Sequence, residues 1–160
     1  MSQRFGWGHI NINVRDLDVS VRFYGKLGFE EFIPGIPYLG LNAEEVGEIS
    51  ADAAEALGVP PGTTGRACIM QLDAGFPKLD LTEFSGREQH QPLQNKDLGL
   101  VRICLSSRDL VSDYEQLKSE GVSFLSPPVT CHKRMADIAI CSDPDGTLIE
   151  LIQIYPERWT

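Results

Sequence analysis

The most constraining feature of this chain is an internal repeat. Residues 14–17, Val-Arg-Asp-Leu, are matched by residues 107–110, Ser-Arg-Asp-Leu, at an offset of 93. Residues 79–84 match residues 149–154 at an offset of 70, which places about 23 extra residues in the first half of the chain. A repeat of this size predicts two related modules, of which the first carries an insertion.

Each module opens with a segment in which polar and apolar residues alternate. In residues 8–14 the alternation puts His9 and Asn11 on one side of a strand and apolar residues on the other. Residues 101–106 repeat this pattern, with Arg102 on the polar side. We therefore expect a sheet in each module with one face packed against a core and one polar face.

A helix and three further strands are expected to follow in each module. Asp16 or Asp18 can cap the first helix and Asp109 the second, and Gly28 and Gly121 can end the helices. The later strands are expected at residues 29–33, 66–72 and 78–84 and at residues 122–125, 137–141 and 147–154. The predicted fold class is therefore α+β, built from two βαβββ modules.

The predicted domain boundaries follow from the repeat. The first module covers residues 1–84 with the insertion at about 34–65, a polar linker covers 85–98, and the second module covers 99–160. The insertion contains no Lys or Arg, and its residues 51–57 could form two helical turns. Both a solvated loop and a lid over the polar sheet face fit this composition.

The composition points to a small-molecule ligand. The 160 residues carry a formal net charge of −9, which disfavours nucleic acid and anionic membrane surfaces as partners. No apolar run reaches the roughly 20 residues needed to span a bilayer, and residues 1–5 do not begin a signal peptide. The four cysteines include no C-x-x-C pair, as expected of thiols in a reducing compartment. We therefore expect a cytoplasmic protein.

The candidate functional residues lie on the polar faces. Common nucleotide-binding, hydrolase and metalloprotease motifs are absent from the sequence. Asp80 and Glu150 occupy equivalent positions on the closing strands, each between apolar neighbours, so their carboxylates point away from the apolar layer. If the opening and closing strands pair, His9 lies near Asp80 and Arg102 lies near Glu150.

Three motifs that span most of the chain resemble one family. Residues 8–17 read Gly-His-Ile-x-Ile-x-Val-x-Asp-Leu, residues 23–29 read Phe-Tyr-x-x-Leu-Gly-Phe, and residues 143–151 read Asp-Pro-Asp-Gly-Thr-Leu-Ile-Glu-Leu. They resemble the vicinal oxygen chelate superfamily, which includes glyoxalase I, extradiol dioxygenases, methylmalonyl-CoA epimerase, and fosfomycin and bleomycin resistance proteins. The resemblance implies a glyoxalase-like fold, with curved mixed sheets around a cavity, and a homodimer.

The resemblance also implies a set of metal ligands. Its positions fall on His9, Asp80 and Glu150, which could hold a divalent ion such as Mn²⁺, Mg²⁺, Ni²⁺, Zn²⁺ or Fe²⁺. The fourth position is Arg102, whose protonated guanidinium offers no lone pair to a cation. Both a metal site and a metal-free cavity therefore stay open, and in a metal-free cavity Arg102 would hold an anionic group of the ligand.

Two functions are consistent with these residues. The first is a glyoxalase-like lyase or isomerase that binds a small anionic organic ligand. Its catalytic residues would be Glu150 and Arg102, and its substrate contacts would be Arg102, Asn11 and Trp7. The second is a metal-free binding or resistance protein, in which apolar contact comes from aromatic residues such as Trp7, Tyr38 and Phe84. An extradiol-type dioxygenase is disfavoured, because Arg102 stands where that branch has a second histidine.

Overall fold

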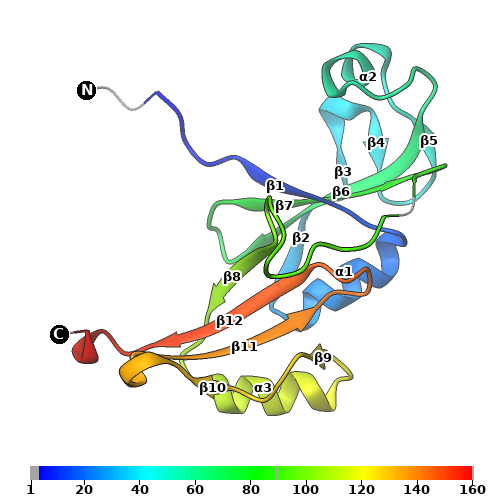
Figure 1. Cartoon of the computed structure of the whole chain (residues 1–160). Helices are drawn as coiled ribbons and strands as arrows, with labels where there is room; N and C mark the ends of the chain where they lie inside the picture. The colour runs from blue at the N-terminus through cyan, green and yellow to red at the C-terminus, as the bar shows by residue number, and fades with distance from the viewer. Residues whose placement is uncertain (1–3, 89, 160) are drawn as a thin grey trace. The chain divides into compact units, whose positions relative to one another are not determined.

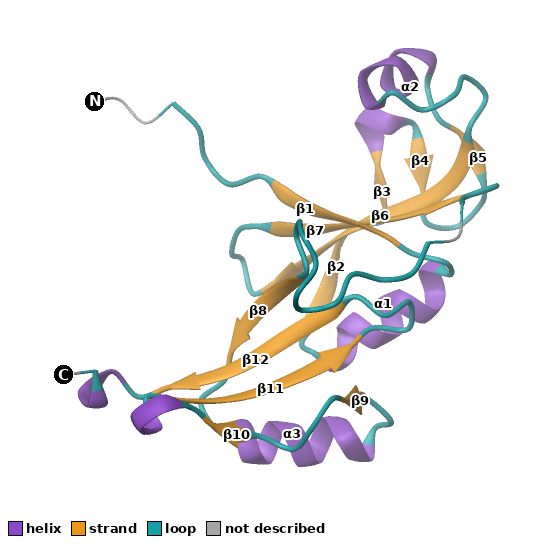
Figure 2. Ribbon diagram, viewed as in Figure 1, coloured by secondary structure: helices purple, strands orange, loops and turns teal. Residues whose placement is uncertain are grey.

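The chain divides between residues 89 and 90 into two compact units (Figure 1 and Figure 2). The computed structural model describes residues 4–88 and 90–159. The division lies inside the predicted linker at residues 85–98, of which residue 89 is outside the described residues. Within the described part of the chain, no helix is long and apolar enough to cross a membrane.

The first unit is built on a mixed sheet with a helix on one face. Its main elements are β1 (His9–Asn13), α1 (Leu17–Lys26), β2 (Phe29–Ile33), β6 (Thr64–Leu72) and β7 (Lys78–Phe84). The strand order is β1-β7-β6-β2; β1 runs parallel to β7, and the other neighbours in this order are antiparallel. Tyr24 of α1 is fully buried, and its ring lies 5.8 Å from that of Phe29, so the helix packs on the apolar face.

The insertion is an ordered part of the first unit. It contains β3 (Gly35–Ile36), a 3₁₀ helix (Pro37–Leu39), β4 (Leu41–Asn42), β5 (Gly47–Glu48) and α2 (Ala51–Leu57). Its apolar side chains form a buried cluster with two residues of β6; the cluster contains Ile36, Leu39, Leu41, Ile49, Ala53, Ala54, Ala67 and Ile69. The helical turns predicted at residues 51–57 are confirmed as α2. The solvated-loop interpretation is wrong, because the segment buries a core of its own.

The second unit repeats the same order of elements. They are β8 (Arg102–Ser106), α3 (Leu110–Ser119), β9 (Ser123–Phe124), β10 (Val129–Thr130), β11 (Ala136–Ser142) and β12 (Leu148–Ile154), with short 3₁₀ helices at His132–Arg134 and Pro156–Arg158. The strand order is β10-β11-β12-β8, with β9 paired to β11 and β8 parallel to β12. The predicted α+β class with two βαβββ modules and mixed sheets is confirmed.

The repeat extends to the hydrogen bonds that start the two helices. The backbone N–H of Leu17 donates to Glu83 Oε2 at 2.7 Å, and that of Leu110 donates to Gln153 Oε1 at 2.9 Å. Both acceptors stand at the same place on the last strand of their module, and each satisfies an N–H that the helix itself leaves unpaired. In the first unit the acceptor is charged, which also favours the positive end of the helix dipole.

Candidate active site

The polar face of the first sheet holds the candidate site. β1 and β7 pair so that Asn11 lies opposite Asp80, and alternate residues of both strands point to the same side. In the same way, β6 places Ile69 opposite Asp80, and Ile69 belongs to the buried cluster of the insertion. The insertion therefore covers the face of the sheet on which the polar residues of β1 and β7 lie.

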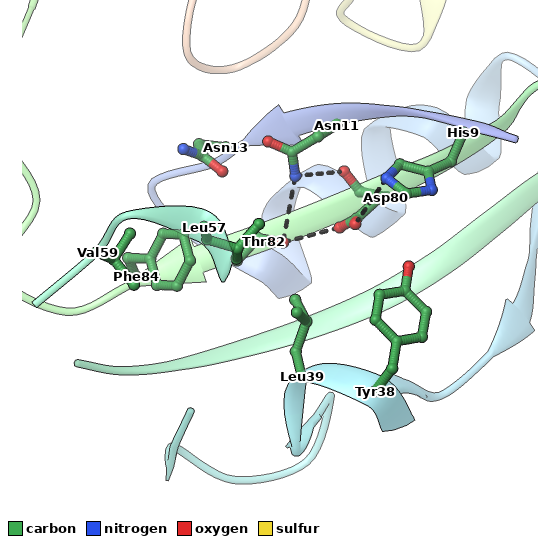
Figure 3. Close-up of a pocket in the computed structure, with 10 residues that line it drawn as sticks. All are labelled: His9, Asn11, Asn13, Tyr38, Leu39, Leu57, Val59, Asp80, Thr82 and Phe84. Carbon is green, nitrogen blue, oxygen red and sulfur yellow. Dashed lines mark hydrogen bonds and ion pairs between the residues drawn. The ribbon is translucent and has the colours of Figure 1, made fainter. Parts of the chain in front are cut away.

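A cavity of about 290 Å³ lies between this face and the insertion (Figure 3). Its lining residues come from β1, β7 and the insertion: His9, Asn11, Asn13, Tyr38, Leu39, Leu57, Val59, Asp80, Thr82 and Phe84. Figure 3 shows His9 and Asp80 at one end of the cavity, with the Tyr38 hydroxyl turned toward them, and Val59 and Phe84 at the other end. The cavity therefore has a polar end and an apolar end.

Asp80 is the buried acid at the polar end. Its side chain is only 4% exposed, and its Oδ1 accepts a hydrogen bond from the Thr82 hydroxyl at 2.8 Å. His9 Nε2 lies 3.6 Å from Asp80 Oδ2, and the imidazole is 41% exposed. Burial raises the pKa of the Asp80 carboxyl, while Thr82, His9 and Asn11 act in the opposite direction. A ligand can thus reach the His9 imidazole directly, whereas it can reach the Asp80 carboxylate only from within the cavity.

Two further polar groups flank this pair. The Asn11 side-chain amide donates to the Asp80 backbone carbonyl oxygen and to the Thr82 hydroxyl, each at 3.4 Å. Tyr38 comes from the 3₁₀ helix of the insertion, and the pKa of its phenol is raised by burial and by the charge of Asp80. A neutral phenol at this place can donate a hydrogen bond to a ligand oxygen.

Arg102 and Glu150 form a pair of their own in the second unit. Arg102 Nε donates to Glu150 Oε2 at 2.5 Å, and its Nη1 donates to Asn95 Oδ1 at 3.2 Å. Cys104 stands opposite Glu150 on β8, and the pKa of its thiol is raised by burial and by that carboxylate. The predicted neighbours, His9 with Asp80 and Arg102 with Glu150, are confirmed.

In the part of the chain that the structure describes, neither unit by itself assembles a metal site. Among the described residues, no group of three or more His, Cys, Asp or Glu side chains is placed to hold an ion. Of the three predicted ligands, His9 and Asp80 lie together in the first unit, whereas Glu150 lies in the second and accepts the hydrogen bond from Arg102. Two side chains are fewer than the three protein ligands of an ordinary catalytic metal site.

The predicted substrate contacts are only partly among the cavity residues. Asn11 and the expected aromatic contacts Tyr38 and Phe84 line the cavity, but Trp7 does not, and Trp7 is 75% exposed. Sequence reasoning did not find Leu57 and Val59, which belong to the insertion. The available signal was the presence of isolated apolar residues in a segment rich in Asp and Glu, because such residues are expected to pack against something.

Comparison with known proteins agrees with this architecture. Residues 6–151 match the model of the Glyoxalase/Bleomycin resistance protein/Dioxygenase superfamily, and the chain belongs to this superfamily. A curated relative, the "lactoylglutathione lyase" of Pseudomonas aeruginosa, is 26% identical over 162 residues, which cover 96% of this chain and 85% of the relative.

Solved structures show the same fold. A glyoxalase family protein from Bacillus cereus matches with a TM-score of 0.74 at 16% identity, over 96% of this chain and 98% of that chain. The trypanothione-dependent glyoxalase I of Leishmania major matches with a TM-score of 0.57 at 20% identity, over 91% of this chain and 84% of that chain.

Proposed function

We propose that this protein is a lyase or isomerase that moves a proton on a small organic substrate bound in the cavity of the first unit. The observation that carries the proposal is the His9–Asp80 pair at the polar end of that cavity. Membership of the superfamily and the relative named as a lactoylglutathione lyase support chemistry of this type.

The proposed roles follow from exposure and charge. The His9 imidazole is accessible and accepts a proton from substrate carbon, while the Asp80 carboxylate stabilises the imidazolium that forms. Tyr38 and Asn11 then supply hydrogen bonds to the substrate oxygen on which negative charge develops. Arg102 and Glu150, predicted as catalytic residues, pair with each other in the second unit, so proton transfer is assigned to His9 instead.

The proposal is tested by isotope exchange. The protein is incubated in D₂O with a panel of small oxo and hydroxy compounds, including lactoylglutathione, with and without chelator. We expect ¹H NMR to detect exchange at a carbon atom next to a carbonyl. The His9→Gln variant should lose this exchange. The control His132→Gln should keep it, because His132 is exposed in the second unit. Exchange that survives His9→Gln would assign the chemistry elsewhere.

A metal-free binding protein is the second candidate. The apolar end of the cavity favours it, because Leu39, Leu57, Val59 and Phe84 offer contact area that proton transfer does not require. This candidate predicts saturable binding of a ligand with no isotope exchange in any member of the panel. Repeating the binding measurement with chelator tests whether binding needs the divalent metal that the superfamily implies.

The proposal extends to the oligomeric state and the cellular location of the protein. We propose a homodimer, which light scattering would detect as twice the chain mass of 17.7 kDa. All four cysteines are free, which supports a reducing, cytoplasmic compartment. A particle of the mass of a single chain in dilute solution would contradict the dimer.

A further inference from the structure

We propose that the cavity of the first unit selects ligands whose polar head is neutral or positively charged, and that it discriminates against carboxylates. This inference rests on the proposed function, because it takes that cavity as the ligand site. It replaces the sequence-based expectation of an anionic ligand, which depended on Arg102.

The side chains that line the cavity determine its charge. The ten lining residues include no Lys or Arg, and Asp80 is the acid among them. The lining therefore contributes a buried carboxylate and no guanidinium or ammonium that could pair with an anion. A carboxylate ligand at the polar end would therefore meet a buried like charge in a partly desolvated space, where Coulomb interactions are strong.

The insertion adds negative charge around the same cavity. Its acidic side chains are all exposed: Glu44, Glu45, Glu48, Asp52 and Glu55. Arg66, the first basic residue after the insertion, donates to Asp18 at 3.1 Å and to Glu83 at 2.8 Å. Its charge is thus balanced by two carboxylates, and the segment that walls the cavity repels anions as they approach.

The basic residue nearest to His9 in the sheet is turned away from the cavity. Lys78 lies opposite His9 in the β1–β7 register, but it is not among the lining residues. Lys78 is buried, and its Nζ donates to Gln71 Oε1 at 2.8 Å and lies 4.5 Å and 4.8 Å from the ring centres of Phe32 and Phe76. The ammonium therefore leans over β6 and β2, on the side of β7 away from β1, and is enclosed by two aromatic rings.

The remaining lining groups suit an uncharged head on a compact apolar body. Asn11, Asn13 and Thr82 offer neutral hydrogen-bonding groups, and an ammonium could lie between the Asp80 carboxylate and the Tyr38 ring. The volume of about 290 Å³ is at the small end of ligand sites in proteins. The ligand class is therefore a small alcohol, carbonyl compound or amine with an aromatic or branched aliphatic body.

Three probes that share one body test the inference: phenethyl alcohol, phenethylamine and phenylacetate. Each is titrated into the full chain at low salt, and binding is measured by ligand-observed NMR. We expect the alcohol and the amine to bind at least about tenfold more tightly than phenylacetate. Equal or tighter binding of phenylacetate, or no binding of any probe, would overturn the inference.

Variants locate the cause of the discrimination. Asp80→Asn keeps the size of the side chain and removes its charge, so the preference for the amine over phenylacetate should shrink by about tenfold. The control Glu115→Gln removes one exposed carboxylate of α3, outside the insertion and not among the cavity residues, and it should leave the preference unchanged within about twofold. If Asp80→Asn fails to fold, the relative affinities of the three probes for the parent protein still test the charge selection.

The proposed function can fail separately. Selective binding of the neutral and cationic probes without isotope exchange in any compound would keep the charge selection and remove the lyase or isomerase proposal. Exchange on an anionic compound, together with tight binding of phenylacetate, would keep the chemistry and remove the charge selection.

Discussion

Arg102 Nε lies 2.5 Å from Glu150 Oε2, so the guanidinium neutralises a carboxylate inside β12, the closing strand of the second module. The Glu150 side chain is only 11% exposed, whereas that of Arg102 is 37% exposed. The acid is therefore the buried member of the pair, and it depends on the arginine for its hydrogen bond more than the arginine depends on it.

Arg102→Met should lower the free energy of unfolding by about 1–3 kcal/mol, because it leaves the buried Glu150 carboxylate without its charged donor. Chemical denaturation of the full chain measures the change. The double variant Arg102→Met/Glu150→Gln should recover part of the loss. The control Arg108→Met, at an exposed arginine of the same unit, should stay within about 0.5 kcal/mol of the parent. Equal effects of the two arginine variants would show that the pair does not stabilise the fold.

Asp80→Asn should change how stability depends on pH. Burial raises the pKa of Asp80 above its ordinary value of 3.8, so above that pH the unfolded chain releases this proton more readily than the folded chain. The carboxyl therefore costs the parent stability as pH rises from about 3.8 through its folded pKa. The variant lacks this group, so its free energy of unfolding relative to the parent should rise across that range. Parallel curves between pH 4 and pH 8 would contradict the raised pKa.

Tyr38→Phe tests whether the insertion contributes to chemistry. It removes the hydroxyl that faces His9 and Asp80 while keeping the ring, so kcat should fall by about tenfold to a hundredfold with a smaller change in KM. The measurement is the exchange rate on the best substrate of the panel. Tyr155→Phe, which removes a phenol bound to Asp137 in the second unit, serves as the control. A change in KM alone would reduce Tyr38 to a binding contact.

The cysteines should fall into two classes of reactivity. Burial raises the pKa of Cys68 to about 12 and that of Cys141 to about 11, and both side chains are fully buried. Cys104 and Cys131 are accessible, although burial and the neighbouring Glu150 raise the pKa of Cys104. At pH 8 a thiol reagent should therefore modify Cys131 first, Cys104 more slowly, and the two buried thiols only after denaturation. Mass spectrometry of the labelled peptides gives the order, and early labelling of Cys68 would contradict it.

The paired side chains could be predicted from the sequence, whereas the packing of the insertion against the sheet could not. Alternation with period two, together with the repeat, is enough to place His9 beside Asp80 and Arg102 beside Glu150, because strand pairing has few registers that keep the apolar residues on one face. Tyr38 is expected from the sequence only as an apolar ligand contact, and it reaches the cavity from an insertion that has no counterpart in the second module. Its position depends on how the insertion packs on β6, which is a tertiary contact without a local pattern.

The buried cluster of the insertion also divides the first unit energetically. Since this segment has a core of its own, anchored on Ala67 and Ile69, it forms a candidate cooperative unit that can open while the β1-β7-β6-β2 sheet stays folded. Such an opening would remove one wall of the cavity. Ligand entry would then be governed by a sub-global unfolding equilibrium, and a bound ligand would slow amide hydrogen exchange in α2 by mass action.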